Sequence, residues 1–586
     1  MRELVCPNLV VGSGCAGLNA ADWLAALGQE VLLITEGMNC GTSRNTGSDK
    51  QTYYKLSLAG DDGDSVGEMA RTLAGPDVDG DIALCEAAGS ARAFFKLVGL
   101  GVPFPDNEAG EYVGYQTDHD TRRRATSAGP LTSRYMTEAL EKSVRARGVP
   151  VLDHTLAFEI LRDDAGLAGL LCLDRRSGEV FAVRCANLIL ATGGPAGIYA
   201  DRVYPASQFG MSGMAFAAGC RGANLHCWQY GLASVGFRWN VSGSYQQAIP
   251  RYVSVDQAGV EREFLAEALG PAAAADMTFL KGYQWPFDPA RAQGSSRVDI
   301  LVKAETDRGR RVYMDYRRNP AGYDPAALCA ETRTYLEACG ALDGATPLQR
   351  LAAINAPAIG LYRSHGIDLA ARMLEVRVCA QHHNGGVGVD SHWQTDLPGL
   401  YVCGEAAGTF GARRPGGTAL NSTQVGSLRA VQQILRSRRP LPARLPALPA
   451  LRLPAGDPGA ALAELQQAMT RHAAFLRDEG GIRALLGRLD ALEAAALPFD
   501  PAAPVSGPKE AVDRERRLRL RDMMVTQRQV LSAMLLENEP GEPGVIETRG
   551  GVSRRRPARP IPDRDLWFER VWRARREEEE EGGMQP

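Results

Sequence analysis

The first forty residues alternate between short apolar runs and a segment with helical spacing. Leu9-Val10-Val11 and Val31-Leu32-Leu33-Ile34 are apolar runs typical of buried strands. Between them, small and aliphatic residues at 20, 21, 24, 25 and 27 recur with the period of a helix. Gly12-Ser13-Gly14-Cys15-Ala16-Gly17 separates the first strand from this helix, and Glu36 follows the second strand. The order strand, glycine turn, helix, strand and acid predicts a βαβ unit that binds a dinucleotide.

Each residue of this unit has a physical role. Gly12 permits the tight turn, Gly14 lets the backbone approach a pyrophosphate, and Gly17 lets the helix pack against the strand. The N–H groups and the dipole of the helix start hold the anion, and Glu36 is placed to accept hydrogen bonds from a ribose. The alternative is a glycine turn without a ligand, but the flanking strand, helix and acid all favour a cofactor. The predicted contacts in this unit are Gly12, Ser13, Gly14, Ala16, Gly17 and Glu36.

Three later segments also place polar or glycine-rich residues beyond a strand. A glycine-punctuated polar loop spans 37–48, and a buried strand at 188–190 runs into a pair of glycines. Another strand ends at Gly404-Glu405, and the loop 411–421 after it opens a helix. Glycines just past a parallel strand let a cofactor approach the sheet closely. We therefore expect further cofactor contacts from Ser43, Asn45, Thr46, Gly47, Ala191, Thr192, Gly193, Gly194, Glu405, Ala419 and Leu420.

The pattern of apolar and polar residues changes twice in the middle of the chain. Helical periodicity covers 66–100 and 130–147. Strand-like runs separated by turn residues predict a small antiparallel meander at 151–161, 167–174 and 180–185. From about 233 to 353, aromatic and polar residues mix without any glycine loop, which indicates an inserted lid.

The C-terminal part reads as a linker followed by helices. Prolines between 440 and 458 predict a stiff linker. Helical spacing then predicts three helices, near 459–478, 481–496 and 509–537. Two charged stretches are read as solvated: Asp118 to Arg124 as a loop, and Arg573 to Glu581 as a frayed helix end.

Composition narrows the class of protein. The 586 residues predict two to four domains. The formal net charge of −3 offers no general attraction to nucleic acid or to anionic membranes. No apolar run is long enough to span a bilayer, and the first strand begins too early for a leader, so we expect a cytoplasmic protein. The 12 cysteines show neither CxxC nor CxxCH spacing, so we expect reduced thiols and no metal site.

Several motifs together resemble the flavoprotein subunit family of fumarate reductase and succinate dehydrogenase, with L-aspartate oxidase as a relative. The marks are GSGCAG with Glu36, ATGG at 191–194, and Trp228-Gln229-Tyr230 before the lid. Further marks follow at HHNGGVGVD (382–390), the run from Thr395 to Glu405, GARRPGGTAL (411–420), Thr548 to Gly551 and Pro562 to Asp565. The resemblance covers most of the chain.

The resemblance implies an α/β fold: a discontinuous Rossmann-like FAD-binding domain with an inserted α+β capping domain and a C-terminal helical domain. It implies FAD and hydride exchange between flavin N5 and a carbon of a carboxylate substrate. The expected boundaries are 1–232 and 355–438 for the FAD-binding domain, 233–354 for the capping domain, 439–458 for the linker, and 459–586 for the helical domain with its acidic tail.

The resemblance also suggests catalytic residues. Arg414 corresponds to the arginine that holds a substrate carboxylate, because a guanidinium fork can bind both oxygens. The family's histidine before paired glycines corresponds to His382 or His383, although Gln381 competes for this position. Arg251 lies nearest to the place of the proton-donating lid arginine, and Arg291 is another candidate for that role.

Departures from the family pattern limit the substrate. Gly231 stands where a substrate-binding histidine is usual, and the lid lacks the Arg-Gly-Glu-Gly run. These changes argue against plain fumarate or succinate and favour a larger or differently shaped unsaturated acid or enone. The loop 39–48 contains no histidine, so FAD should be bound noncovalently.

Three functions remain open from the sequence. The leading hypothesis is reduction of an activated C=C bond, or the reverse oxidation, which acts on CH–CH groups. The second is an amino-acid oxidase like L-aspartate oxidase. The third is a flavin electron-transfer subunit of a multi-protein complex. The expected partners are a small-molecule substrate and an electron-donor protein, with no nucleic acid and no membrane insertion.

Overall fold

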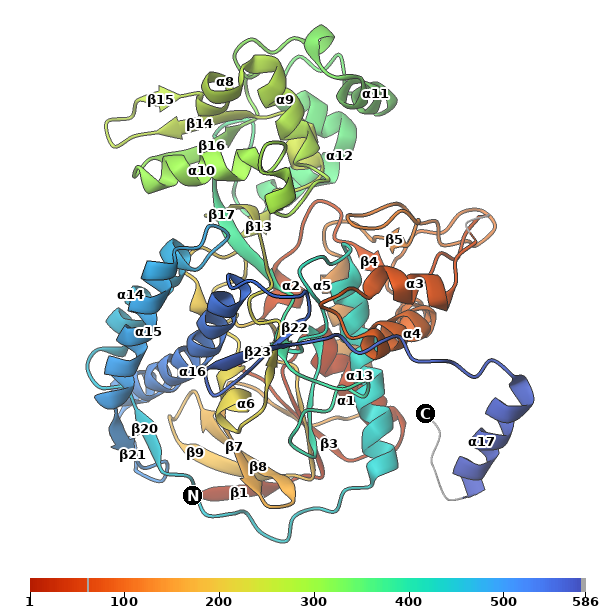
Figure 1. The fold of residues 1–586 in the computed structure, drawn as a ribbon, viewed down its shortest axis with the longest axis vertical. Helices are drawn as coiled ribbons and strands as arrows, with labels where there is room; N and C mark the ends of the chain where they lie inside the picture. The colour runs from red at the N-terminus through yellow and green to blue at the C-terminus, as the bar shows by residue number, and fades with distance from the viewer. Residues whose placement is uncertain (61–62, 581–586) are drawn as a thin grey trace.

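A body and a separate lobe make up the chain. The computed structural model describes residues 1–60 and 63–580; Glu581, the last residue of the charged tail run, lies outside them. Figure 1 shows the lobe standing above the body, with the three long C-terminal helices along one side of the body. The α/β fold expected from the sequence is confirmed.

The centre of the body is a five-stranded parallel sheet in the order β19-β10-β2-β3-β6. Val11, Ile34, Leu190 and Val402 are the last residues of four of these strands, and the register places them side by side at one edge. The first four strands in this order are completely buried, as parallel strands covered on both faces are. The strands are β2 (Asn8–Val11), β3 (Val31–Ile34), β6 (Val151–Leu152), β10 (Asn187–Leu190) and β19 (Leu400–Val402).

Helices from distant parts of the sequence cover this sheet. Helix α1 packs against both α5 and α13, and α13 also packs against α4. The bounds are α1 (Cys15–Ala26), α2 (Thr42–Asn45), α3 (Val66–Leu73), α4 (Gly80–Gly99), α5 (Thr132–Ala146), α6 (Gly213–Ala217) and α13 (Thr418–Ser437). The helices expected over 66–100 and 130–147 are confirmed, with a break before Gly80.

The predicted meander is also confirmed. Strands β7 (Thr155–Asp163), β8 (Gly166–Asp174) and β9 (Val180–Arg184) pair antiparallel, and the N-terminal strand β1 (Arg2–Val5) adds a parallel edge to β9. Short pairs complete the body: β4 (Tyr53–Tyr54) with β5 (Ala125–Thr126), and β11 (Gly222–Ala223) with β18 (Gly386–Val387) and β22 (Val545–Arg549), which pairs with β23 (Val552–Arg556).

The upper lobe is built on a six-stranded sheet in the order β13-β12-β17-β16-β14-β15. Two of these strands, β12 (Trp228–Ser234) and β17 (Leu374–His383), pair with each other and run from the lobe into the body. The others are β13 (Trp239–Asn240), β14 (Arg251–Val255), β15 (Glu261–Arg262) and β16 (Arg311–Asp315). The lobe helices are α7 (Ser244–Gln247), α8 (Phe264–Leu269), α9 (Pro271–Leu280), α10 (Arg297–Asp307), α11 (Ala330–Ala338) and α12 (Pro347–Ser364).

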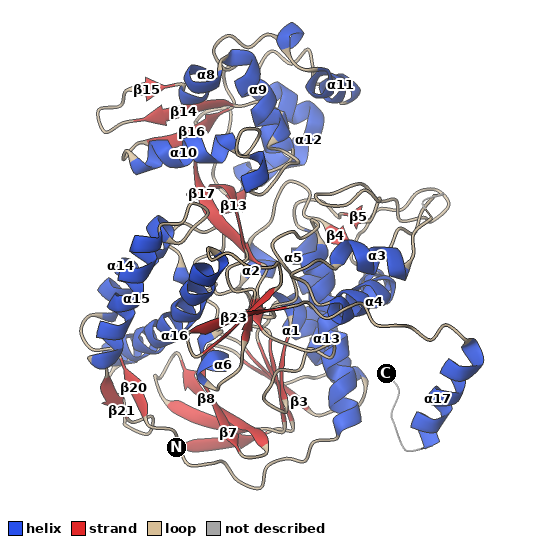
Figure 2. Cartoon of the chain, in the orientation of Figure 1, coloured by secondary structure: helices blue, strands red, loops and turns tan. Residues whose placement is uncertain are grey.

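The three C-terminal helices pack on one another and on the body. They are α14 (Pro458–His472), α15 (Glu479–Ala494) and α16 (Pro508–Glu537), in agreement with the three predicted segments. Figure 2 shows α17 (Phe568–Glu580) apart from the body at the end of an extended segment. Strand β20 (Leu451–Leu453), in the linker, pairs antiparallel with β21 (Leu497–Phe499), which lies between α15 and α16.

Candidate functional site

A cavity of about 760 Å³ opens where the strands of the central sheet end. It runs from the glycine turn of the βαβ unit to the underside of the lobe. This volume falls within the range of about 300–1,000 Å³ that is usual for ligand sites. Of the predicted cofactor residues, those that line it are Gly12, Ser13, Gly14, Ala16, Glu36, Ser43, Thr46, Gly47, Ala191, Thr192, Gly193, Glu405, Ala419 and Leu420.

The glycine turn has the geometry that a bound pyrophosphate requires. Gly12 has φ of +113°, and a Cβ there would lie 2.3 Å from the carbonyl oxygen of Ala191. A Cβ on Gly17 would lie 1.8 Å from the carbonyl oxygen of Gly12, so α1 contacts the turn directly. A Cβ on Gly14 would lie 3.2 Å from the hydroxyl of Ser43, and both residues line the cavity. Because these glycines have no side chains, the backbone of the turn can be approached closely by an anion.

Three predicted cofactor residues do not line the cavity. Gly17 packs α1 against the turn. Gly194 packs against Glu405, whose Oε1 lies 2.5 Å from the position of an added Cβ. The Asn45 side chain donates to the carbonyl oxygens of Asn39 and Gly41 and so holds the shape of its own loop.

Glu405 is held firmly at the sheet edge. Its Oε1 accepts hydrogen bonds from the Tyr204 hydroxyl and from the backbone N–H of His383 at 2.9 Å. Burial raises the pKa of this carboxyl. The side chain therefore joins β17 to the loop after β19, directly at the cavity wall.

Arg414 is a buried cation in the cavity wall. Its guanidinium donates to Gln229 Oε1 at 2.6 Å, Asn384 Oδ1 at 3.1 Å and Thr418 Oγ1 at 3.1 Å. Among the described residues, its hydrogen-bond acceptors are all uncharged oxygens, and it forms no ion pair. Burial lowers its pKa to about 10. A buried guanidinium with only neutral partners is suited to receive an anion.

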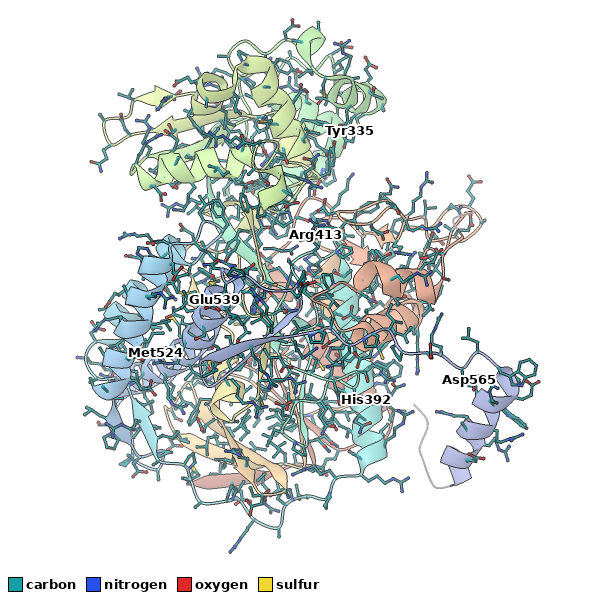
Figure 3. The ribbon with its side chains drawn as sticks, viewed as in Figure 1. Tyr335, His392, Arg413, Met524, Glu539 and Asp565 are labelled. Carbon is teal, nitrogen blue, oxygen red and sulfur yellow. The ribbon has the colours of Figure 1, made fainter. Side chains whose placement is uncertain are left out.

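The neighbouring arginine differs. Arg413 is exposed, and Figure 3 shows it at the top of the body, on the side toward the lobe. Arg413 is absent from the cavity lining.

The structure separates the two adjacent histidines. His382 lines the cavity, and its Nδ1 lies 2.9 Å from Asn384 Oδ1. Because Asn384 Oδ1 already accepts from Arg414, His382 Nδ1 is assigned as a donor, which leaves Nε2 as an acceptor. Burial holds the pKa of His382 well below its usual value, so the ring is neutral.

His383 faces the protein interior instead. Its ring stacks on Trp228 with centroids 4.2 Å apart, and Nε2 lies 3.1 Å from the Leu225 carbonyl oxygen. Burial lowers its pKa to about 3. Gln381, the third candidate for this position, lines the cavity and accepts a hydrogen bond of 2.7 Å from Trp285 Nε1.

The structure does not bring Arg251 into the cavity. Arg251 lies on β14 and pairs with Glu263 at 2.6 Å, Glu261 at 3.1 Å and Asp315 at 3.5 Å. Three carboxylates of the lobe hold its guanidinium, and Arg251 is absent from the cavity lining, so it is not placed to contact a substrate there. Arg291, the other lid arginine considered, pairs loosely with Asp288 at 3.8 Å and is also absent from the cavity lining.

The charged run from Asp118 to Arg124 is largely a loop with exposed residues, as expected, but its two ends are not solvated. Arg124 is 1% exposed and pairs with Asp64 at 2.7 Å and with Asp120 at 3.3 Å. Asp118 lines the cavity and is half-buried. The expectation was wrong for Arg124, because Asp64, one of its two partners, lies 60 positions away, beyond any local charge pattern.

Asp118 lies beside the Arg414 loop. A Cβ on Gly416 would lie 2.3 Å from the hydroxyl of Thr117, so the two loops touch there. Burial raises the pKa of Asp118 to about 7, although the charges of Arg291, Lys281 and Arg414 oppose the shift. A titratable carboxyl and a buried arginine thus face one cavity.

The lobe contributes aromatic and amide side chains to the cavity roof. Figure 3 shows Tyr335 on the lobe, and its hydroxyl donates to Gln247 Oε1 at 3.0 Å. The roof residues are Asn240, Ser242, Gln247, Tyr283, Trp285, Pro286 and Tyr335.

A dinucleotide-sized cavity at the edge of a parallel sheet, roofed by an inserted lobe, defines a nucleotide-cofactor enzyme with a covered substrate site. The chain belongs to the FAD binding domain family, whose model matches residues 8–420.

Named relatives agree with this assignment. L-aspartate oxidase of Agrobacterium fabrum is 28% identical over 84% of this chain and 86% of its own length. L-aspartate oxidase of Mesorhizobium japonicum is 29% identical over 69% and 70% of the two chains. The fold is that of Mycobacterium smegmatis Sdh1 in complex with UQ1, with a TM-score of 0.71 and 19% identity over 96% of each chain.

FAD is the cofactor, and the protein is an FAD-dependent oxidoreductase that is similar to L-aspartate oxidases. The bare glycine turn, the polar loop at 42–49 and the carboxylate of Glu36 fit the phosphates and ribose of this cofactor. In residues 1–60 and 63–580, no cluster of metal-ligating side chains is present. The same residues contain no helix long and apolar enough to cross a membrane.

Proposed function

We propose that this protein oxidises a small acidic α-amino acid, with Arg414 binding a carboxylate and Asp118 binding the amino group. The observation that carries the proposal is that the buried guanidinium of Arg414 and the carboxyl of Asp118 line one cavity. An α-amino acid carries both charges within a few ångströms, and each would meet its opposite there. The similarity to the two L-aspartate oxidases supports the same substrate class.

FAD supplies the hydride acceptor for this chemistry. Arg414 fixes the substrate by a two-pronged contact, while Gln229, Asn384 and Thr418 hold the guanidinium in place. The ammonium group loses a proton as the Cα–N bond becomes C=N, and Asp118, with a pKa of about 7, is suited to accept it.

The neutral ring of His382 supports the same substrate. Its Nε2 is left as an acceptor by the bond between Nδ1 and Asn384, which suits an N–H group of the substrate. The lobe residues Trp285 and Tyr335 roof the cavity, and such a cover would reduce the access of water to the reacting carbon.

A second candidate is reduction of an activated C=C bond in an unsaturated acid or enone. The raised pKa of Asp118 favours it, because a carboxyl that is partly protonated at neutral pH can deliver the proton. A fumarate reductase (CoM/CoB) chain of Methanothermobacter marburgensis, 25% identical over 72% of this chain and 71% of its own length, agrees with this direction. An electron-donor protein would then reduce the flavin.

One experiment separates the two functions. Oxidised holoprotein is mixed without oxygen with acidic amino acids, and chemically reduced holoprotein is mixed with enoates and enones; flavin absorbance is followed in both. Bleaching by an acidic amino acid supports the proposal. Reoxidation by an enoate, with no bleaching by any amino acid, overturns it in favour of C=C reduction.

A further inference from the structure

The C-terminal helix α16 reaches the far end of the cofactor cavity. Arg519 of this helix donates from Nη2 to Oε2 of Glu36 at 2.5 Å. Its guanidinium also lies over the ring of Phe209, 5.2 Å from the centroid, and Phe209 lines the cavity. A residue 483 positions from Glu36 therefore contacts the carboxylate at the predicted ribose end.

A closed set of charge-assisted hydrogen bonds surrounds this contact. Glu515 Oε1 accepts from Arg519 at 2.8 Å and from Arg175 at 3.0 Å. Arg175 donates in turn to the backbone carbonyl oxygen of Glu36 at 2.8 Å. The segment after β3, the turn between β8 and β9, and α16 are thus joined by one hydrogen-bond network. Such bonds are directional and hold side chains in one orientation.

The contact leaves Glu36 able to bind a ligand. Within the described residues, the hydrogen bond of its carboxylate uses Oε2, so Oε1 remains available to a ribose hydroxyl. The side chain of Glu36 is 25% exposed, whereas that of Arg519 is 12% exposed. Without Arg519, the carboxylate would be free to turn toward water.

We propose that Arg519 is a positioning residue for the cofactor: it orients Glu36 toward the adenosine ribose, so that helix α16 completes the FAD site. The proposal rests on Glu36 as the ribose acceptor. It makes cofactor retention depend on the C-terminal helices, which contribute no residue to the glycine turn.

The test measures release of FAD from purified holoprotein, by the rise of flavin fluorescence after dilution. The variants are Arg519→Gln, Arg519→Lys, Glu36→Gln and the double variant Glu36→Gln/Arg519→Gln. Arg521→Gln is the matched control, because it removes a second ion pair between α16 and the body, to Glu159 at 2.6 Å, outside the Glu36 cluster. Melting temperature is measured for every variant.

Arg519→Gln should speed release about tenfold, Arg519→Lys less, and Arg521→Gln no more than about twofold. The double variant should release FAD no faster than the quicker single variant, because both changes remove the same contact. Equal acceleration by Arg519→Gln and Arg521→Gln, or multiplicative effects in the double variant, would show that Arg519 only docks the helix, and would overturn the proposal. Unchanged release from Glu36→Gln would overturn the ribose assignment and the proposal with it.

Discussion

The guanidinium of Arg414 donates a hydrogen bond of 2.6 Å to the side-chain oxygen of Gln229, a residue of strand β12 that lies 185 positions earlier in the chain. Gln229 is in register with His382 on the neighbouring strand. Arg414 is therefore held directly by Gln229, and it shares the side-chain oxygen of Asn384 with His382.

Replacing Arg414 tests the carboxylate contact. Arg414→Lys keeps the charge but loses the planar fork. Turnover should fall about a hundredfold or more, as expected when about 3 kcal/mol of oriented charge contact is lost. Steady-state kinetics on the native substrate measure this, and flavin content should not change. The exposed Arg413 is the control: Arg413→Lys should leave turnover near normal. Near-normal turnover in Arg414→Lys would remove the carboxylate role.

The titration of Asp118 gives a pH dependence whose sign depends on the reaction. In amino-acid oxidation the carboxylate is the active form, so the rate should rise as the pH increases through about 7. In C=C reduction the protonated carboxyl is the active form, and the rate should fall over the same interval. Asp118→Asn should abolish this pH dependence of the rate, and Asp118→Glu should restore it in part. A pH–rate profile unchanged in Asp118→Asn would exclude Asp118 from proton transfer in both reactions.

The two adjacent histidines should respond differently to the same change. His382→Gln should lower kcat/KM by about 10- to 100-fold with little change in melting temperature, because His382 lines the cavity. His383→Gln should instead destabilise the fold by about 1–3 kcal/mol, because a buried stacked ring and its hydrogen bond are lost. Kinetics and thermal unfolding of both variants check the pair. The reverse pattern would assign the family histidine to His383.

Acid denaturation tests how FAD is attached. The loop at 39–48 contains no histidine, so the precipitated polypeptide should be colourless and all FAD should remain in the supernatant. Absorbance of the supernatant and flavin fluorescence of the polypeptide on a denaturing gel measure the two fractions. A fluorescent polypeptide would establish a covalent link at another residue.

The fold was accessible from the sequence because its signals are local. Buried parallel strands are continuous apolar runs in the sequence. Glycine is required at position 12, because a Cβ there would clash with the carbonyl oxygen of Ala191. The site was accessible only in part. Arg414 stood in a specific motif, but nothing near Asp118 in the sequence reveals that it faces a cavity. Asp64 lies 60 positions from Arg124, and Arg519 lies 483 positions from Glu36, so only the tertiary structure brings these pairs together.

Strands β12 and β17 carry both the lobe and the substrate-facing side chains. Gln229 lies at the body end of one strand and His382 at the body end of the other, while the lobe ends of both strands extend its sheet. The pairing shifts register between Gln229 and Tyr230, next to the cavity. Because the two strands are continuous from the lobe to the cavity, we expect any displacement of the lobe to be transmitted to Gln229 and His382, so that the position of the lobe and the contacts to a substrate are coupled.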